Sequence, residues 1–211
     1  MKNVSPKSAL VSLSDKTNLD LLISFLLERN VEIISTGGTY KAIKKITDNV
    51  IEVSEYTGHK EMMDGRVKTL HPKIHAGILA RRGEDTDVLK SMDYKEIDIV
   101  VVNLYPFEET IKSGCSFEEA IEQIDIGGPT MIRAAAKNFK DVLVLSDPND
   151  YEEMISEWNS KNGISYEFRK KQAAKVFKKM SQYNKAIHQY IESENDENVI
   201  MDLSNPKVLR Y

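Results

Sequence analysis

The sequence has little of several residue types, and each shortage excludes a class of protein. One cysteine, Cys115, in 211 residues excludes a disulfide framework and a zinc site built from thiolates. No apolar run approaches the ~20 residues of a membrane-spanning helix, and the N-terminus lacks the apolar core of a signal peptide. Positive charge is not in excess, since 33 acidic residues outnumber 29 Lys and Arg. These absences argue against a nucleic-acid binder or a membrane protein and favour a cytoplasmic one.

The charge that is present is unevenly spread. Between residues 55 and 82 there are six Lys and Arg against three acids, and three of the four histidines fall there. Such a basic segment in an acidic protein is typical of a site for a small anion. It is equally typical of a solvated face with chance clustering, so both interpretations stay open.

Hydrophobic periodicity predicts a parallel sheet packed between helices, because strand and helix patterns alternate along the chain. We expect residues 55–75 to form a long functional loop and residues 193–211 to form a linker after a domain that spans residues 1–192. The predicted strands are 8–13, 31–34, 50–53, 76–80, 97–102 and 142–145, and the predicted helices are 16–29, 39–46, 84–92, 116–123, 128–137, 149–158 and 166–192.

Two turns between a strand and a helix predict a phosphate site. Ser14-Asp15-Lys16-Thr17 follows the first strand, and Thr36-Gly37-Gly38-Thr39 follows the second. Hydroxyls, an ammonium and backbone N–H groups at helix starts bind phosphate, and paired glycines let the backbone approach it. Taken separately, each turn is also explained as helix capping. Together they point to one edge of a parallel sheet, where such folds bind ligands.

A third group of polar residues lies in the segment from Gly65 to Lys73. Arg66 offers a bidentate fork, Lys68 a mobile charge and Thr69 a hydroxyl. If the segment is extended, Arg66 and Lys68 point to the same side. His71 and His75 are four residues apart, but no acid or thiol accompanies them, so packing or capping roles are favoured over a metal site.

Two further motifs follow the most strand-like run. Asn103-Leu104-Tyr105-Pro106-Phe107 comes directly after it, and Asp125-Ile126-Gly127-Gly128-Pro129-Thr130 resembles the start of a helix. Free N–H groups there stabilise a developing oxyanion, and Asp125 is placed to accept a proton or orient an amide. A plain helix cap is the alternative for Asp125.

Read in order, SDKT, GGT, GRVKTLHP, HAGIL, NLYPF and EQIDIGGPTMIRAAAKN resemble the landmarks of the cyclohydrolase domain of the PurH family of purine-biosynthesis proteins. The resemblance covers Ala9 to Tyr190. Leu209-Arg210-Tyr211 resembles the opening of the family's second, formyltransferase domain, so we expect the chain to stop at the boundary between the two domains.

The resemblance implies a methylglyoxal-synthase-like α/β fold: a parallel sheet flanked by helices, with extra helices at the C-terminus. It implies dehydrating ring closure of 5-formamidoimidazole-4-carboxamide ribonucleotide (FAICAR) to inosine monophosphate, an IMP cyclohydrolase reaction without metal or cofactor. The substrate 10-formyltetrahydrofolate would serve only the absent formyltransferase domain. The family forms dimers, so a homodimer is expected.

The resemblance also assigns roles by matching motif. Lys137 is the implied proton donor and acceptor, with Lys68, Tyr105 and Asp125 in support. A continuous helix from Gly127 would place Lys137 ~15 Å along it, so the helix is interrupted, the chain folds back, or Lys137 serves a partner subunit's site. The implied substrate-binding residues are Ser14, Asp15, Lys16, Thr36, Gly37, Gly38, Thr39, Arg66, Val67, Thr69, Asn103, Ile126 and Gly127.

Two other functions are possible on the same fold. Methylglyoxal synthase eliminates phosphate from a triose phosphate, and the allosteric domain of carbamoyl-phosphate synthetase binds nucleotides without chemistry. All three would share a turn like Thr36–Thr39, but only the cyclohydrolase explains GRVKTLHP, NLYPF and IDIGGPTMIRAAAKN together.

Overall fold

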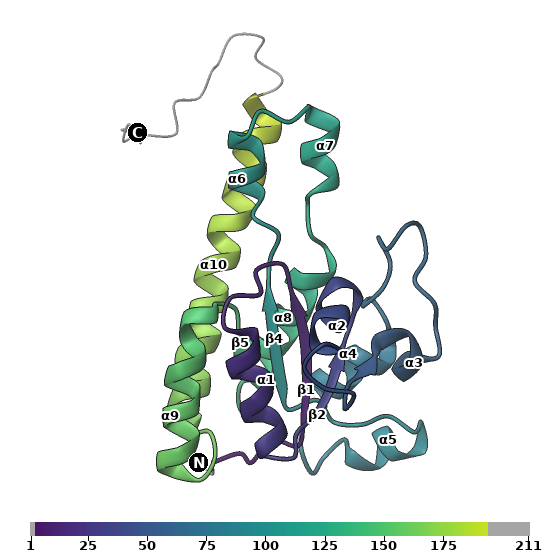
Figure 1. Ribbon diagram of the computed structural model, residues 1–211, viewed down its shortest axis with the longest axis vertical. Coiled ribbons are helices and arrows are strands. Elements are labelled where there is room, and N and C mark those ends of the chain that lie inside the picture. The colour runs from purple at the N-terminus through teal and green to yellow at the C-terminus, as the bar shows by residue number, and fades with distance from the viewer. Residues whose placement is uncertain (1–2, 194–211) are drawn as a thin grey trace.

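A five-stranded parallel sheet forms the centre of the computed structural model, which describes residues 3–193 (Figure 1). All four strand pairings are parallel. After β1 (Ser8–Leu13) the chain adds two strands on one side of it. It then crosses to the other side of β1, where β4 (Ile99–Asn103) and one further strand complete the sheet. The crevice beyond the ends of β1 and β4 is therefore the switch point where such sheets bind ligands. The strands are β1 (Ser8–Leu13), β2 (Glu32–Ser35), β3 (Ile51–Glu52), β4 (Ile99–Asn103) and β5 (Leu143–Leu145), in the spatial order β3-β2-β1-β4-β5.

Helices cover both faces of the sheet, because its strands are apolar on both sides. Alternate residues of β1 point to opposite faces. Ala9 and Val11 share one core cluster with α1 (Leu19–Glu28), α2 (Gly37–Ile43) and α9 (Tyr151–Lys161). Leu10 belongs to the other cluster, with α4 (Pro72–Leu79), α8 (Gly127–Lys137) and α10 (Tyr166–Ser193). The predicted architecture, a parallel sheet between helices with additional C-terminal helices, is confirmed.

One predicted strand is wrong, because residues 76–80 belong to α4 or follow it directly. Pro72 occupies the first position of this helix, where its missing N–H and fixed φ are favourable. The His71 ring accepts a hydrogen bond from the backbone N–H of Lys73 at 3.1 Å and so caps the helix. The apolar run 76–80 therefore reflects the buried side of a helix.

The predicted loop 55–75 is also less irregular than expected. It contains most of α3 (Val53–Thr57) and the start of α4, and Val53 begins α3 where the sequence predicts the end of a strand. The other elements are α5 (Thr86–Ser91), α6 (Phe107–Lys112), α7 (Phe117–Glu122) and a 3-10 helix (Pro148–Asp150). Of these, α6 has no counterpart among the predicted elements. The predicted linker lies almost wholly outside the described residues.

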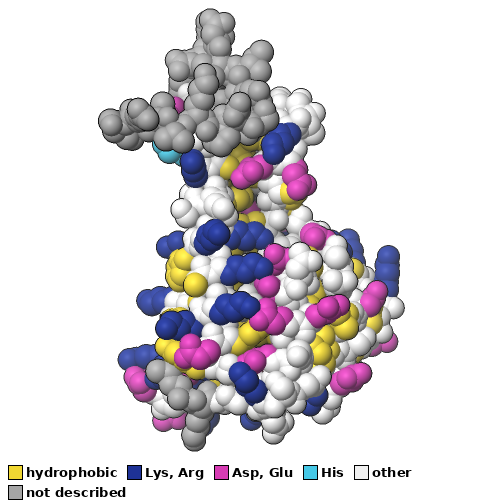
Figure 2. Space-filling model, turned by 90° about the vertical axis from the view of Figure 1, so that its left-hand side faces the viewer, with side chains coloured by type: hydrophobic (Ala, Val, Ile, Leu, Met, Phe, Trp, Pro, Cys, Tyr) yellow, Lys and Arg dark blue, Asp and Glu magenta, His cyan; other side chains and the backbone are white. Residues whose placement is uncertain are grey.

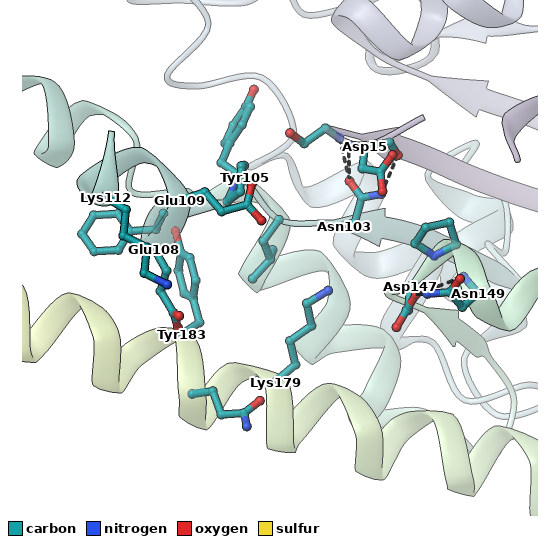
Figure 3. A pocket seen from close by; sticks show the side chains of 16 residues that line it. Asp15, Asn103, Tyr105, Glu108, Glu109, Lys112, Asp147, Asn149, Lys179 and Tyr183 are labelled. Atoms are coloured by element: carbon teal, nitrogen blue, oxygen red, sulfur yellow. Dashed lines mark hydrogen bonds between the residues drawn. The ribbon is translucent and has the colours of Figure 1, made fainter. Parts of the chain in front are cut away.

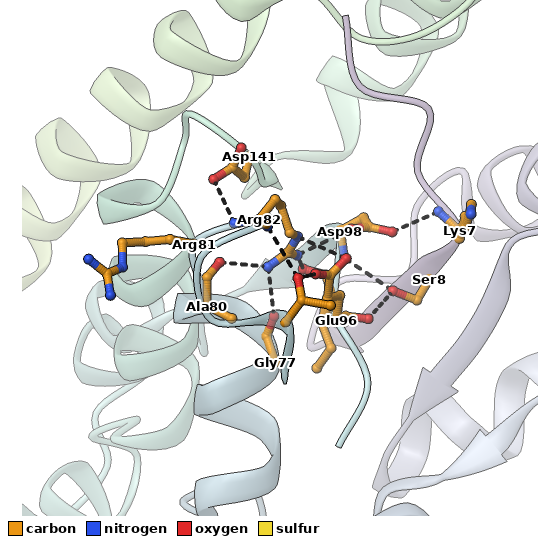
Figure 4. Close-up of polar contacts among 12 residues, drawn as sticks. Lys7, Ser8, Gly77, Ala80, Arg81, Arg82, Glu96, Asp98 and Asp141 are labelled. Atoms are coloured by element: carbon orange, nitrogen blue, oxygen red, sulfur yellow. Dashed lines mark hydrogen bonds and ion pairs between the residues drawn. The ribbon is translucent and has the colours of Figure 1, made fainter. Parts of the chain in front are cut away.

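A polar network around Arg82 closes the N-terminal edge of the sheet (Figure 4). The Arg82 guanidinium donates to the carbonyl oxygens of Ala80 and Ile97, both at 2.8 Å, and to Asp98 Oδ1 at 3.2 Å. The backbone N–H of Lys7 donates to Asp98 Oδ2 at 2.8 Å. One side chain thus joins the end of α4 to the starts of β1 and β4.

The long helix α10 runs beside α9 and extends beyond the sheet, where α6 and α7 lie against its outer end (Figure 1). Figure 2 shows Lys and Arg side chains gathered along the side of the molecule that α9 and α10 form. Near the start of α10, the buried Arg169 donates to the carbonyl oxygens of Phe139 and Lys140 and fixes the helix to the end of α8. No helix within residues 3–193 is long and apolar enough to cross a membrane.

Candidate active site

A cavity of about 580 Å³ opens at the C-terminal edge of the sheet, beyond the ends of β1, β2 and β4. Residues 64–69 and the segment that leads into α8 complete its walls. It brings together fourteen of the predicted site residues from five separate segments: Ser14, Lys16, Thr36, Gly37, Gly38, Thr39, Arg66, Lys68, Thr69, Asn103, Tyr105, Asp125, Ile126 and Gly127.

The turn after β1 is held by the side chain of Asn103. Asn103 Oδ1 accepts the backbone N–H groups of Ser14 at 2.7 Å and Asp15 at 3.0 Å. Its Nδ2 donates to the carbonyl oxygen of Asp15 at 2.7 Å. The sequence predicts that Asn103 faces the ligand. In the structure it lines the cavity and also fixes the loop, a role that local sequence does not reveal.

The turn after β2 brings the start of α2 to the cavity. Gly37 has φ +56°, and a Cβ there would lie 3.1 Å from Lys68 Nζ, so the turn favours a residue without a side chain. The Thr39 hydroxyl accepts the N–H of Leu13 at 2.8 Å and donates to its carbonyl oxygen at 3.0 Å. That hydroxyl therefore joins α2 to β1, which leaves the backbone of the turn as its ligand-binding part.

The segment around Arg66 and Lys68 forms a short antiparallel bridge between Met62 and Val67. Val67 is part of this bridge and does not line the cavity, whereas its two basic neighbours do. Arg66 pairs with Glu122 at 3.2 Å, and Lys68 pairs with Glu61 at 2.7 Å. Both acids are more than half exposed, so these pairs compete with water and can open to an anionic ligand.

Asp125 lies between α7 and α8, with its carboxylate against the start of α8. Its Oδ1 accepts the backbone N–H of Gly128 at 2.8 Å. Burial raises the pKa of Asp125 above its usual range, and the N–H groups of Gly128 and Gly127 oppose that rise. A Cβ at Gly128 would lie 2.3 Å from Asp125 Oδ2, and one at Gly127 would lie 2.6 Å from Thr69 Oγ1. The absence of a side chain at Gly128 and Gly127 therefore lets the Asp125 carboxylate and the Thr69 hydroxyl lie against the start of α8.

Lys137 lies away from this cavity. The helix α8 is continuous from Gly127 to Lys137, and Lys137 is exposed at its last position. Neither an interrupted helix nor a chain that folds back is observed. Of the three expected explanations, a role of Lys137 in a partner subunit's site is the one that stays a prediction.

A second cavity of about 740 Å³ lies toward α10 and shares Ser14, Asn103 and Tyr105 with the first (Figure 3). Asp15 lines this second cavity, and its Oδ1 accepts the backbone N–H of Thr17 at 2.9 Å. Lys179 extends into it from α10, and burial lowers the pKa of that side chain. Tyr105 and Ile126 line the first cavity and are 52% and 55% exposed. Both side chains are therefore accessible to a ligand.

His71 and His75 do not form a metal site with acids or thiols. Within residues 3–193 no three His, Cys, Asp or Glu side chains are placed to hold a metal ion. The His71 ring caps α4, and the His75 ring lies near the backbone of Thr69. Both histidines thus shape the segment that carries Arg66, Lys68 and Thr69.

Comparison with known families gives this arrangement its context. The profile of the MGS-like domain family matches residues 19–130, which include the turn Thr36–Thr39 and Asp125. This chain belongs to the MGS-like domain family. A second profile, for the AICARFT/IMPCHase bienzyme, matches residues 135–211. The MGS-like assignment confirms the fold class that the sequence motifs imply.

Curated relatives confirm the resemblance to PurH. The chain is 51% identical over 208 residues to the bifunctional purine biosynthesis protein PurH of Clostridium acetobutylicum. The match covers 97% of this chain and 42% of that protein. It is 53% identical over 191 residues to PurH of Fusobacterium nucleatum, with 90% and 38% covered. The chain thus spans about two fifths of the length of these relatives. A crystal structure of ForH is 32% identical, with a TM-score of 0.74 over 87% of this chain and 97% of that one.

Proposed function

We propose that this MGS-like domain is an IMP cyclohydrolase that closes the second ring of FAICAR to give inosine monophosphate in purine biosynthesis. The similarity to PurH proteins over nearly the whole chain supports this reaction. The structural observation that carries the proposal is one cavity with cations and the turns after β1 and β2 at one end and a half-buried carboxylate at the other. A ribonucleotide has a phosphate at one end and a reacting base at the other, and this cavity has matching chemistry.

The reaction requires two proton transfers and no redox step. The carboxamide nitrogen attacks the formyl carbon, loses one proton, and the formyl oxygen gains one. The resulting carbinol loses its hydroxyl as water, with the second proton taken from the former formamide nitrogen. The enzyme must therefore anchor the phosphate, hold the two reacting groups together and move protons between nitrogen and oxygen.

The phosphate end of the cavity is the part near α2. The backbone of Thr36, Gly37 and Gly38 approaches the ligand without obstruction, and Lys68 Nζ lies above Gly37. Arg66 and Lys16 add positive charge on either side, which favours a dianionic phosphate over a neutral ligand. Ser14 and Thr69 supply hydroxyls for the phosphate or ribose. The loop that carries Ser14 is held in place by Asn103.

The base end of the cavity is formed by Asp125, Ile126, Gly127 and Tyr105. A carboxylate whose pKa is raised by burial is a better proton acceptor than an exposed one. Asp125 is suited to take the proton from the attacking carboxamide nitrogen. The exposed Tyr105 hydroxyl is suited to donate a hydrogen bond to the formyl oxygen as charge develops there. Lys137 would complete the proton transfers from the partner subunit of a homodimer.

The remaining parts of the proposal concern the whole protein. No metal or cofactor is assigned to the cyclohydrolase reaction. The similarity to bifunctional relatives supports a formyltransferase domain, acting with 10-formyltetrahydrofolate, in the whole protein. Purine nucleotides are cytoplasmic metabolites, so we place the enzyme in the cytoplasm.

Two alternatives are separated by their ligands. A methylglyoxal synthase would turn over a triose phosphate, and a regulatory domain would bind nucleotides without turnover. The ordered base end, with Asp125 fixed on the start of α8, favours a reaction on the base over simple nucleotide binding. We retain the alternatives as outcomes of the test.

The test is a spectrophotometric time course of FAICAR conversion by the purified 211-residue chain without added metal. We expect inosine monophosphate to form, and turnover to be lost in Lys137→Ala while that variant stays folded by circular dichroism. Binding of inosine monophosphate without turnover would favour the regulatory domain. Conversion of dihydroxyacetone phosphate with no effect on FAICAR would favour the lyase.

A further inference from the structure

Tyr183, on α10, makes a hydrogen bond to the backbone of the candidate catalytic residue Asp125. The Asp125 N–H donates to the Tyr183 hydroxyl oxygen at 2.8 Å across 58 residues of sequence. Residues 124–126 lie between α7 and α8 and belong to neither helix. The acceptor of the Asp125 N–H is therefore a side chain and not a backbone carbonyl of a helix, and a half-buried N–H without an acceptor is unfavourable.

The side chain of Asp125 is held separately from its backbone. Gly128 donates its N–H to Asp125 Oδ1 at 2.8 Å, and the absent Cβ of Gly128 leaves room for Oδ2. Asp125 thus has two anchors, the start of α8 for the carboxylate and Tyr183 for the peptide. Removal of the second anchor would free the peptide to rotate and carry the carboxylate away from α8.

The ring of Tyr183 also contacts the segment that carries Tyr105. It packs edge-on against Phe107 with ring centroids 6.3 Å apart. Phe107 is 1% exposed, and its backbone N–H donates to the carbonyl oxygen of Tyr105 at 2.9 Å. Figure 3 shows Tyr183 reaching from α10 toward the segment that carries Tyr105. One tyrosine thus connects the segments that present Tyr105 and Asp125.

We propose that Tyr183 is a positioning residue for the ring closure: it acts through Asp125 and does not touch the substrate. The inference rests on the proposed cyclohydrolase function. The helix α10 contributes no residue to the walls of the candidate active site. Through Tyr183 it would fix the spacing between the segments that carry Tyr105 and Asp125.

The kinetic test compares Tyr183→Phe with Tyr166→Phe. The first removes the hydroxyl and keeps the ring on Phe107. The second makes the same chemical change on the same helix, at a ring that packs on Phe139. We expect kcat to fall about tenfold in Tyr183→Phe with KM changed less than about threefold, because positioning affects the transition state more than binding. Tyr166→Phe should match the wild type in both.

The pH dependence of kcat distinguishes a positioning role from a purely structural one, because a loss of stability alone would not shift it. The N–H groups of Gly127 and Gly128 hold down the pKa of Asp125. If the peptide rotates in Tyr183→Phe, the carboxylate loses part of that stabilisation and its pKa rises. The acid limb of the kcat profile should therefore move to higher pH, and it should stay in place in Tyr166→Phe.

A measurement without substrate separates this inference from the proposed function. Titration of the Asp125 carboxyl carbon by NMR in selectively labelled chain should give a higher pKa in Tyr183→Phe than in the wild type, and the Asp125 amide should exchange faster. A lower melting temperature with kcat and this titration unchanged would overturn the positioning role. Absence of turnover in the wild type would overturn the proposed function, and the titration would still decide whether Tyr183 positions Asp125.

Discussion

At the N-terminal edge of the sheet, Arg82 is only 18% exposed and its partner Asp98 11%, and the guanidinium also bonds backbone carbonyls. At the C-terminal edge, Arg66 and Glu122 form an ion pair of the same type with exposures of 66% and 58%. The first pair is desolvated and surrounded by further hydrogen bonds, so it stabilises the fold. The second is open to water and weak, so its cation remains able to bind a ligand. An arginine–carboxylate pair thus stabilises the fold at the N-terminal edge, whereas a similar pair at the C-terminal edge leaves its arginine free to bind a ligand.

The largest expected effect that tests this comparison is loss of turnover in Asp125→Asn. We expect kcat to fall by about 10²–10³ because the proton acceptor is removed, while the amide oxygen still accepts the Gly128 N–H. Initial rates and a thermal melt measure the two consequences. The matched control is Asp98→Asn, which should lower stability and leave kcat per folded molecule unchanged. A large loss of kcat in Asp98→Asn would contradict the division between the edges.

Arg82→Met should give the next largest effect, on stability alone. We expect the free energy of unfolding to fall by about 2–4 kcal/mol, because Asp98 and the carbonyls of Ala80 and Ile97 lose their donor. Urea unfolding followed by circular dichroism measures it. Arg81→Met is the control, since the neighbouring Arg81 is 63% exposed and should have little effect.

A smaller effect is expected when Arg66 is removed. Arg66→Ala should weaken binding of inosine monophosphate about tenfold to a hundredfold through loss of a charge-assisted contact, and should barely change the unfolding midpoint. Isothermal titration calorimetry measures the affinity. Unchanged affinity would remove Arg66 from the phosphate site and leave Lys68 and the turns after β1 and β2 to hold the anion.

The smallest expected effect is a pH dependence that begins at the site edge. Burial lowers the pKa of His75 below its usual 6.5, so as pH falls the unfolded chain binds the proton first. Stability should therefore be present above about pH 6.5 and decline as pH falls further. Hydrogen exchange between about pH 8 and about pH 5 should show the His71 amide, which donates to the Thr69 carbonyl oxygen, losing protection before the Asp98 amide. In His75→Gln this early loss should diminish; an identical loss would exclude His75 as its source.

The sheet could be predicted from sequence because its strands are short runs between turns, and all except β3 are mostly or fully buried. The run 76–80 is equally apolar, and a short apolar run does not distinguish a buried helix from a strand. The decisive signal was Pro72 after a capping His71, which marks a helix start. The helix α6 has Glu108 and Glu109 in its first turn and Lys112 in its last, but its six residues are too few to show a helical hydrophobic period.

The site was predictable to the level of segments, because turns after parallel strands meet at one edge. What each side chain does there depends on contacts between distant residues. Asn103 bonds a loop 88 residues away, Thr39 closes on Leu13, and Tyr183 reaches Asp125. No periodicity or motif records such contacts, so the ligand-facing role of Asn103 and the structural role of its amide could not be separated beforehand.

The continuity of α8 from Gly127 to Lys137 has a consequence for how two subunits would share an active site. Asp125 lies two residues before the first residue of α8 and Lys137 is its last residue, so in the proposed homodimer each active centre would be assembled from two polypeptides. Two dead variants, Asp125→Asn and Lys137→Ala, should then rescue each other when unfolded together and refolded as a mixture. Random pairing makes half of the dimers mixed, and each mixed dimer has one intact centre, so about a quarter of wild-type turnover should return. A mixture that stays inactive would place both residues in the same polypeptide's centre.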